Sequence, residues 1–391
     1  MTADLGDRVA SVRKRRGLSQ KELAEAAGIS LSLIKKIEQG QRDRVRLETL
    51  RDLAVALGVR TSILQNGHSD AEWADDGTVD LWEPVRRALA GGGQVDEIEQ
   101  ESTLAGVERE FAALRPDLDE HRYRDVAAAL PALLRDVADL DAEGRAIRSR
   151  ILGMTGWLLV QNRQFDTADD ALDRAIDQAP DRPAAVAAVN ARVWSLLRQG
   201  KLAASAELAQ KWADDIEPRF STATALQLAL WGRLWLYVAN IGVRDNSPGT
   251  TEDALALAKA AASRIGREVV YDQATQRSFG PVTVARAAGE CAVIMGRPER
   301  VLSIAESIPR SAVRMQTSAT HLRHRLDIAQ AHTDLRQYGE AMTVMQDLHA
   351  TAPEWLPQQR YARDILGTVV RERRTLTEDV RQLADAIRLE Y

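Results

Sequence analysis

Apolar residues near the N-terminus recur at helical spacing, and polar residues divide them into two short runs. Between Leu18 and Gly40 the apolar positions fall on one face of each of two predicted helices. The two faces consist of Leu23, Ala24 and Ala27 in the first helix and of Leu33, Ile34 and Ile37 in the second. Because alanine is small, the pattern predicts two helices that cross closely.

The residues at the ends of these two helices are those that start and stop helices. Ser19 and Glu22 form the capping-box pattern for the first helix, and Ser30 is a good N-cap for the second. Gly28 supplies a permissive backbone between them, and Gly40 ends the second helix. Two short capped helices joined by a tight glycine turn have the geometry of a helix-turn-helix that reads DNA.

Hydrophobic positions from about residue 95 onward also follow helical periods, without the alternation that indicates a sheet. Two segments show the spacing of a two-helix repeat of about 34 residues. They consist of Leu152, Gly156, Leu159, Phe165, Ala168, Leu172, Ala175 and Pro180, and of Ile328, Ala329, His332, Tyr338, Ala341, Met345, Leu348 and Pro353. Weaker copies begin near Val189, Trp231 and Gly289, the second with a loop over residues 244–251. We therefore expect an all-α chain.

Turn-forming residues separate the N-terminal helices from the repeats. Residues 66–80 hold few apolar side chains, and a run of three glycines at 91–93 follows a short helical segment. We expect a DNA-binding domain over residues 1–66, a linker with a short helix over residues 67–94 and a helical-repeat domain over residues 95–391.

Charge is uneven along the chain. The net charge is −5, yet residues 1–66 hold 13 Lys and Arg against 8 Asp and Glu, so this segment carries +5 and the remainder −10. A basic N-terminal segment on an acidic remainder favours phosphate binding at that end alone.

Composition also indicates the compartment. The single cysteine, Cys291, excludes a disulfide framework within the chain and fits a small buried residue, with a redox sensor as the alternative. The charged segment 4–16 does not resemble a cleavable signal. The most membrane-like run, 226–243, contains Arg233 and is better explained as a buried helix. We expect a cytoplasmic protein with no membrane segment.

The N-terminal pattern resembles the xenobiotic-response-element-type family, which has the fold of the lambdoid phage repressors, over about residues 3–66. The matching residues are Arg13, Leu18, Ser19, Gln20, Leu23, Ala24, Gly28, Ile34, Ile37, Glu38, Gly40, Leu50, Leu53, Ala54, Leu57, Gly58 and Val59. The resemblance implies a five-helix helix-turn-helix domain, and it implies that Arg13 and Glu38 form a partly buried, structural ion pair. The later repeats resemble a tetratricopeptide-like α-solenoid.

In such a fold the second helix of the pair lies in the major groove. The expected DNA contacts are Gln20, Ser30, Leu31, Ser32, Lys35, Lys36, Arg42, Arg44 and Arg46. An exposed Leu31 has no folding role and can meet a thymine methyl group, whereas Lys35 and Lys36 suit a guanine or a phosphate. Gln20, at a positive helix end, suits a phosphate, as the resemblance also implies.

In a tetratricopeptide superhelix the first helix of each repeat faces the concave groove. The expected groove residues are Arg150, Trp157, Asn190, Trp194, Arg233, Arg286, Glu290, Arg323 and Gln330. Arginines can clamp a carboxylate or phosphate, Asn190 can bond a peptide backbone, and tryptophans can stack on a ring. The alternative is that Trp157 and Trp194 are core between repeats and that the arginines are solvated or paired with acids.

Signatures of catalysis and of cofactors are missing from the sequence. His321 and His324 lie one helical turn apart, but no cysteine or dense carboxylate cluster completes a metal shell. Phosphate-binding glycine loops, nucleophile elbows and His-Glu zinc helices do not occur either. We expect neither an enzyme nor a cofactor.

These patterns together predict a sequence-specific DNA-binding transcriptional regulator whose repeats sense a small ligand or a peptide. A single head of this type contacts little DNA, so we expect a homodimer on an inverted-repeat operator in double-stranded DNA. The architecture is similar to that of actinobacterial regulators and, more distantly, of the peptide-pheromone regulators of Gram-positive bacteria. The alternative is a DNA-binding adaptor whose repeats recruit a protein partner without a small effector.

Overall fold

Helices make up nearly all of the regular structure in the computed structural model. It describes residues 5–42, 45–65, 80–91, 102–309, 318–372 and 377–389. The expected loop and linker at 66–79 lie outside the described residues, as does Arg44. The all-α prediction is confirmed, with an N-terminal five-helix unit followed by a tetratricopeptide-like solenoid.

Five short helices form the N-terminal unit, which we call the head. They are α1 (Leu5–Arg15), α2 (Gln20–Ala26), α3 (Leu31–Glu38), α4 (Leu47–Leu57) and α5 (Thr61–Gln65). Leu23, Ile34 and Ile37 are fully buried in a core that the head does not share with the rest of the chain. The Ser19 hydroxyl accepts a hydrogen bond from the Glu22 amide at 3.2 Å, and the Ser19 amide donates to the Glu22 carboxylate at 2.7 Å. The predicted capping box is therefore present.

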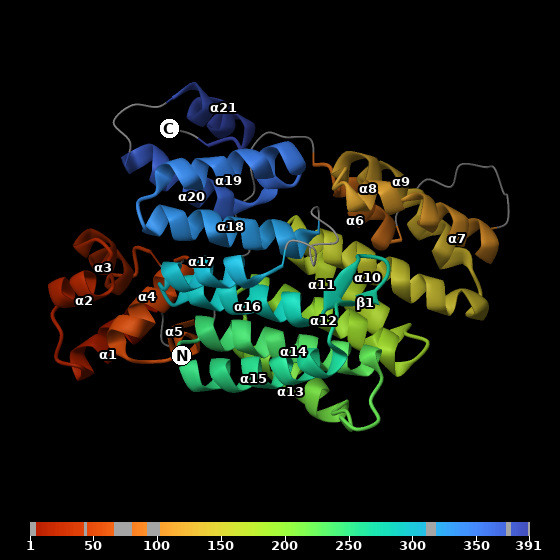
Figure 1. Cartoon of the computed structure of the whole chain (residues 1–391), viewed down its shortest axis with the longest axis horizontal. Coiled ribbons are helices and arrows are strands. Elements are labelled where there is room, and N and C mark those ends of the chain that lie inside the picture. Colours follow the sequence, from red (N-terminus) through yellow and green to blue (C-terminus); the bar gives the residue numbers. More distant parts are fainter. Residues whose placement is uncertain are drawn as a thin grey trace.

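The rest of the described chain, which we call the body (α6–α21), is built mainly from antiparallel helix pairs (Figure 1). The pairs are α10 (Arg145–Gln161) with α11 (Phe165–Asp177), α12 (Arg182–Arg198) with α13 (Leu202–Asp215), α14 (Ala225–Arg244) with α15 (Pro248–Ile265), α16 (Pro281–Ile294) with α17 (Pro298–Ser307), and α18 (Ala319–Asp334) with α19 (Tyr338–Thr351). A side chain at Gly156 would place its Cβ 2.5 Å from Leu172 Cγ. Only glycine thus lets α10 approach α11 this closely.

Further helices flank these pairs. They are α6 (Glu83–Leu89), α7 (Leu104–Ala113), α8 (Arg115–Asp119) and α9 (Tyr123–Asp139) on the N-terminal side, and α20 (Arg360–Glu372) and α21 (Glu378–Ala386) on the C-terminal side. Helix α6 lies in the segment expected to be a linker, yet its Val85 and Leu89 belong to the same buried cluster as α9. The core of the body therefore includes this helix.

A short antiparallel hairpin interrupts the helices, and the sequence analysis missed it. Strand β1 (Val269–Asp272) pairs with β2 (Arg277–Phe279) between α15 and α16. The Phe279 ring packs where a Gly232 side chain would be, 2.2 Å from the ideal Cβ. Strands this short show no readable alternation. The loop expected over residues 244–251 is also shorter than predicted, because α15 already begins at Pro248.

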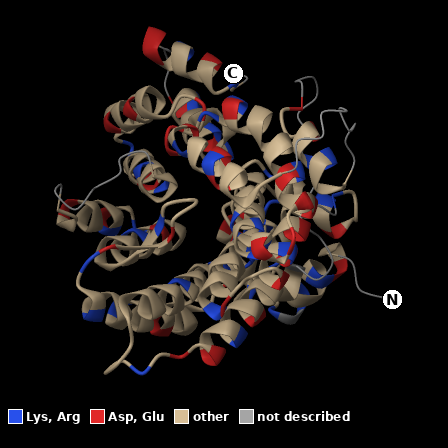
Figure 2. Ribbon diagram, turned by 90° about the vertical axis from the view of Figure 1, so that its right-hand side faces the viewer, with Lys and Arg blue, Asp and Glu red and all other residues tan. Residues whose placement is uncertain are grey.

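The two ends of the body meet, so the solenoid closes on itself. The Tyr123 amide at the start of α9 donates to a carboxylate oxygen of Glu354 at 3.0 Å, and the rings of His121 and Trp355 lie 6.4 Å apart. Figure 2 shows the resulting curved path of the helices around the body's centre. No helix in the described part of the chain has both the length and the apolar character needed to cross a bilayer.

Candidate DNA interface and central cavity

Helix α3 presents a polar and basic face to solvent. Ile34 and Ile37 are buried on its inner side, whereas Ser32, Lys35 and Lys36 are exposed on the other. The Ser30 hydroxyl caps the helix by accepting from the Leu33 amide at 3.2 Å. Hydroxyl groups at the N-terminal end of α3 and positive charges in its last turn suit both base edges and phosphates.

Leu31 corrects one element of the sequence analysis. It was expected to be exposed without a folding role, but it is half-buried and packs against the core of the head together with Leu33 and Ile29. Its position at the start of α3 still leaves part of the side chain accessible. Packing within the head is therefore enough to explain why this position holds a leucine, without any contact with DNA.

A buried ion pair joins α1 to α3. Arg13 donates from Nε to Glu38 Oε1 at 2.6 Å and from Nη2 to Glu38 Oε2 at 2.8 Å, which confirms the pair that the family resemblance implied. Burial alone would raise the pKa of Glu38, but hydrogen bonds from Arg13 and Gln20 outweigh it and hold that pKa below its usual value. Gln20 donates to Glu38 Oε2 at 2.8 Å, so its amide is already engaged by the head rather than free for a phosphate.

Of the three arginines expected after α3, two are described. Arg42 is exposed. Arg46 faces the body, where its Nη1 lies 3.0 Å from a carboxylate oxygen of Asp364 on α20. Arg42 is thus open to solvent, whereas Arg46 contacts the body.

Further hydrogen bonds dock the head on the end of α14. Arg51 Nε donates to the Val243 carbonyl at 3.1 Å, and the Thr61 hydroxyl donates to the Arg244 carbonyl at 2.7 Å. The Ser62 amide donates to Asp245 at 2.7 Å. The head is therefore attached both at α14 and at α20, next to the concave side of the body (Figure 1).

A cavity of about 280 Å³, which we call the inner cavity, lies on that concave side. The first helix of each pair contributes to its wall, as expected for a tetratricopeptide-like groove, and so do α4, α20 and the hairpin. It adjoins a space of about 930 Å³, the outer cavity, which is also lined by Arg46 and Glu48 of the head. The head thus completes the walls of both cavities.

Most of the expected groove residues are brought together here. The inner cavity is lined by Trp157, Trp194, Arg233, Arg286, Glu290 and Arg323. Gln330 lines the outer cavity and donates to Asp334 at 2.7 Å. The rings of Trp157 and Trp194 lie 6.4 Å apart in the wall, so these residues contact each other and also face the cavity.

Two expected groove residues lie elsewhere. Arg150 is exposed, with its guanidinium 5.3 Å from the centre of the Phe111 ring. Asn190 is fully buried, and its amide donates to the Val186 carbonyl at 3.0 Å within its own helix. Both lie on the same helical face as the cavity-lining tryptophan of their helix, but one to two turns before the part of the helix that reaches the cavity.

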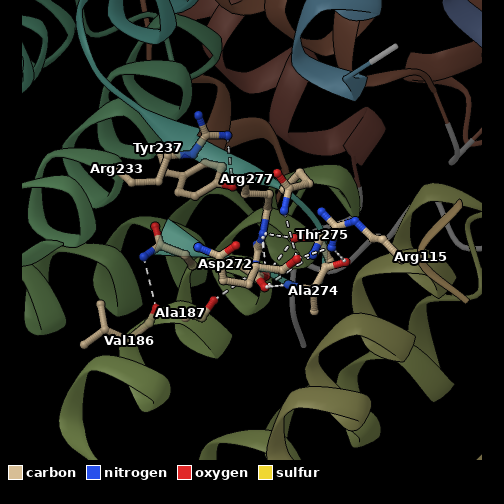
Figure 3. Close-up of polar contacts among 12 residues, drawn as sticks. Arg115, Val186, Ala187, Arg233, Tyr237, Asp272, Ala274, Thr275 and Arg277 are labelled. Atoms are coloured by element: carbon tan, nitrogen blue, oxygen red, sulfur yellow. Dashed lines mark hydrogen bonds and ion pairs between the residues drawn. The ribbon is translucent and has the colours of Figure 1, made fainter. Parts of the chain in front are cut away.

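Further residues of the wall were not predicted from the sequence. Arg198 follows Trp194 by one helical turn, and Tyr237 follows Arg233 by the same spacing. Continuing each expected groove face by four residues would have found both. Arg277 comes from the unforeseen hairpin, where Asp272 holds it at 2.7 Å and it also donates to the Ala187 carbonyl at 3.1 Å (Figure 3).

His321, His324 and Cys291, which lie near the cavity, are shifted toward their neutral forms. Burial, followed by the charge of Arg286, lowers the pKa of His321 and of His324 to about 4. Burial raises the pKa of Cys291 to about 12, which makes its thiol unreactive. The described residues contain no group of three His, Cys, Asp or Glu side chains that could hold a metal ion.

Comparisons with known proteins agree with the geometry of the head. A family model described as a helix-turn-helix domain matches residues 4–62. The HTH-type transcriptional regulator SinR of Bacillus licheniformis is 34% identical over 90 residues, which cover 22% of this chain and 79% of that protein. SinR of Bacillus subtilis (strain 168) is 32% identical over the same length and shares of the two chains.

One solved structure aligns with most of the chain. It is the crystal structure of Bacillus thuringiensis PlcR in complex with the peptide PapR7 and DNA, with a TM-score of 0.38, 13% identity, and coverage of 87% of this chain and 98% of that one. The relationship to SinR is what assigns the family. The chain belongs to the HTH-type transcriptional regulators, and its helix-turn-helix head is its DNA-binding unit.

Proposed function

We propose that this regulator reads an operator with α3 and that a small ligand in the inner cavity controls how the head is held on the body. The observation that carries this proposal is that Arg46 and Glu48 of the head belong to the wall of the cavity lined by the repeats. A ligand there touches both parts of the molecule. Its affinity must then depend on the position of the head, which is the condition for coupling ligand to DNA.

The head is held on the body mainly by polar contacts, and Leu47 of α4 also packs against the apolar core of the body. Arg46 and Asp364 form an ion pair whose side chains are 52% and 34% exposed. Burial and the nearby carboxylate of Asp364 raise the pKa of Glu48, so the charged form of this acid is less stable here than in solvent. Such contacts give a small energy difference between docked and released heads, which a ligand of modest affinity can overcome.

For DNA binding we propose the exposed residues of the head. Ser30, Ser32, Lys35 and Lys36 would face base edges and neighbouring phosphates, with Leu31 contributing its accessible part, and Arg42 and Arg44 would hold the backbone. Gln20 and Arg46 would reach DNA only after leaving Glu38 and Asp364. We further propose a cytoplasmic homodimer on an inverted repeat, with residues 1–66 as the DNA-binding domain and 95–391 as the sensor and dimerisation domain. Residues 67–94 would link them, with the short helix α6 of this segment packed in the core of the body.

The experiment starts from DNA fragments that the purified chain selects from a random library, which give the operator. Operator affinity is then measured with and without a low-molecular-mass extract of host cells. We expect the extract to change the affinity of the wild type and of Arg150→Gln, which lies outside the cavity, but not of Trp194→Ala. Equal responses of all three proteins would contradict sensing in the inner cavity, and no response in any of them would favour recruitment of a protein partner instead.

A further inference from the structure

We infer that the inner cavity is a receptor for an oxyanion, the phosphate or carboxylate group of a small organic molecule. The guanidinium groups of Arg198, Arg233, Arg286 and Arg323 would hold it. This inference deepens the proposed function and rests on it only in taking the inner cavity as the sensing site.

The charges of the cavity wall do not balance. Among the described residues, nine arginines but only four carboxylates line the inner cavity. His324, also in the wall, is neutral at physiological pH because its pKa is lowered to about 4. The wall therefore carries a clear excess of positive charge within a body whose sequence is acidic overall.

The carboxylates that are present are occupied by other arginines. Glu290 lies 2.5 Å from Arg244, and Asp364 lies 3.0 Å from Arg46 and 3.7 Å from Arg360. Asp327 compensates little, because burial and the charge of Glu290 raise its pKa well above the usual value and favour its neutral form.

Four arginines of the wall have no carboxylate oxygen within 4.0 Å in the part of the chain that the structure describes. Arg198 lies over the Trp194 ring at 5.5 Å, and Arg233 over the Tyr237 ring at 4.7 Å. Arg286 contacts the neutral ring of His321 at 3.0 Å, and Arg323 reaches only the amide of Gln359, at 3.4 Å. None of these partners carries a negative charge.

Two of these arginines also keep buried donors that no described protein group accepts. They are the Nε atoms of Arg233 and Arg286. Arg233 uses an Nη donor for the Tyr237 hydroxyl at 3.2 Å, which leaves its remaining donors for another acceptor (Figure 3). The surroundings of Arg198 oppose its charge, because burial and the nearby charges of Arg323, Arg163 and Arg244 lower its pKa well below the usual value.

Guanidinium groups held together without counter-charges are unfavourable in a protein interior unless an anion joins them. Phosphates and carboxylates fit this need, since they accept two parallel hydrogen bonds from one guanidinium. The volume of about 280 Å³ suits a metabolite rather than a macromolecule. Trp157 and Trp194 supply flat faces beside Arg198 for the uncharged part of such a molecule.

The test is calorimetric titration of the full chain with two probes, sodium pyrophosphate for phosphates and sodium citrate for carboxylates, at constant ionic strength. We expect saturable binding of at least one probe, weakened about tenfold or more in Arg198→Gln and in Arg323→Gln. The control Arg150→Gln removes an exposed arginine outside the cavity and should bind as the wild type does. The inference is overturned if neither probe binds saturably, or if all three variants bind equally.

Thermal unfolding separates loss of the site from loss of the fold. Without a probe, Arg198→Gln should unfold at the same or a higher temperature than the wild type, because it removes an opposed charge. The binding probe should raise the unfolding temperature of the wild type but not of this variant. A variant that is less stable without the probe would contradict the claim that Arg198 lacks a counter-charge.

Operator affinity measured with the probe distinguishes the two proposals. A probe that binds through Arg198 and Arg323 but leaves operator affinity unchanged supports the oxyanion site and contradicts sensing. Absence of probe binding, together with an operator response to cell extract that Trp194→Ala removes, contradicts the oxyanion site and supports sensing.

Discussion

Arg13 in the core of the head is paired with a carboxylate, whereas Arg198 and Arg323 in the inner cavity are not paired with any carboxylate of the described residues. In the head, Arg13 has a side chain 11% exposed and both of its hydrogen-bonding edges are used, one by the two carboxylate oxygens of Glu38. It also donates to the Leu18 carbonyl at 2.7 Å. In the body, Arg198 and Arg323 face a cavity together, and no carboxylate lies within 4.0 Å of either among the described residues.

This difference separates two uses of the same side chain. An arginine whose counter-charge belongs to the fold fixes two elements relative to each other, here α1 and α3. An arginine whose counter-charge is missing leaves the fold with an unfavourable electrostatic term that a bound anion removes. Loss of an arginine of the first kind should lower stability, whereas loss of one of the second kind should weaken anion binding.

The largest effect is expected for Glu38→Gln. This change leaves the buried guanidinium of Arg13 without its counter-charge, which should lower the stability of the head by about 3–5 kcal/mol. Denaturant unfolding measures the loss. The matched change Glu25→Gln removes the exposed partner of Lys21, 3.9 Å away, and should cost less than about 0.5 kcal/mol. Equal losses would show that the Arg13 pair is not the structural element we describe.

The next effect concerns pH and the neutral histidines beside the cavity. Because the folded-state pKa of His324 is about 4 and the unfolded value about 6.5, the unfolded chain binds protons first as pH falls, and stability declines between these values. The contribution of His324 over this range is about 3 kcal/mol. We expect His324→Gln to reduce the slope of stability against pH. A bound anion should raise the pKa of His324 by offsetting Arg286, and an unchanged value by NMR would count against an anion near this ring.

Arg42 is exposed, and it belongs neither to a buried ion pair nor to the wall of the inner cavity. Arg42→Ala should weaken binding to specific and unrelated DNA alike, by about 1 kcal/mol, and should lower the salt slope by about one. Its unfolding should match that of the wild type. Ser32→Ala is the contrast, because it should change the preferred sequence more than the salt slope. Identical behaviour of the two variants would contradict the placement of α3 in the major groove.

The smallest effect is expected at the contact between head and body. Asp364→Asn removes the counter-charge of Arg46 at a partly exposed pair, so stability should change by at most about 1 kcal/mol. If the docked head opposes DNA binding, operator affinity rises; if it supports binding, affinity falls. A rise or a fall in operator affinity would each support control of DNA binding by docking of the head, whereas an unchanged affinity would argue against it.

Much of the head was predictable from sequence because its determinants are local. The Ser19–Glu22 capping box lies within one helical turn, and the Arg13–Glu38 pair follows from the family resemblance. Leu31 was expected to be exposed, because its packing against the core of the head depends on the tertiary structure.

The cavity was predictable only in part. The spacing of the repeats predicted that Arg233, Arg286 and Arg323 face the cavity, because all three lie on the first helix of a pair. Their lack of counter-charges depends on residues tens of positions away: Glu290, for example, pairs with Arg244 rather than with Arg323. The closure of the body through Tyr123 and Glu354 joins residues more than two hundred positions apart, so no local pattern indicates it.

The most direct measurement is a crystal structure of the full chain grown with whichever probe anion binds in the titration. We expect the anion in the inner cavity, with its oxygens within hydrogen-bond distance of at least two of the guanidinium groups of Arg198, Arg233, Arg286 and Arg323. An anion found only on the outer surface, or carboxylates of the chain seated against these four arginines instead, would contradict the account.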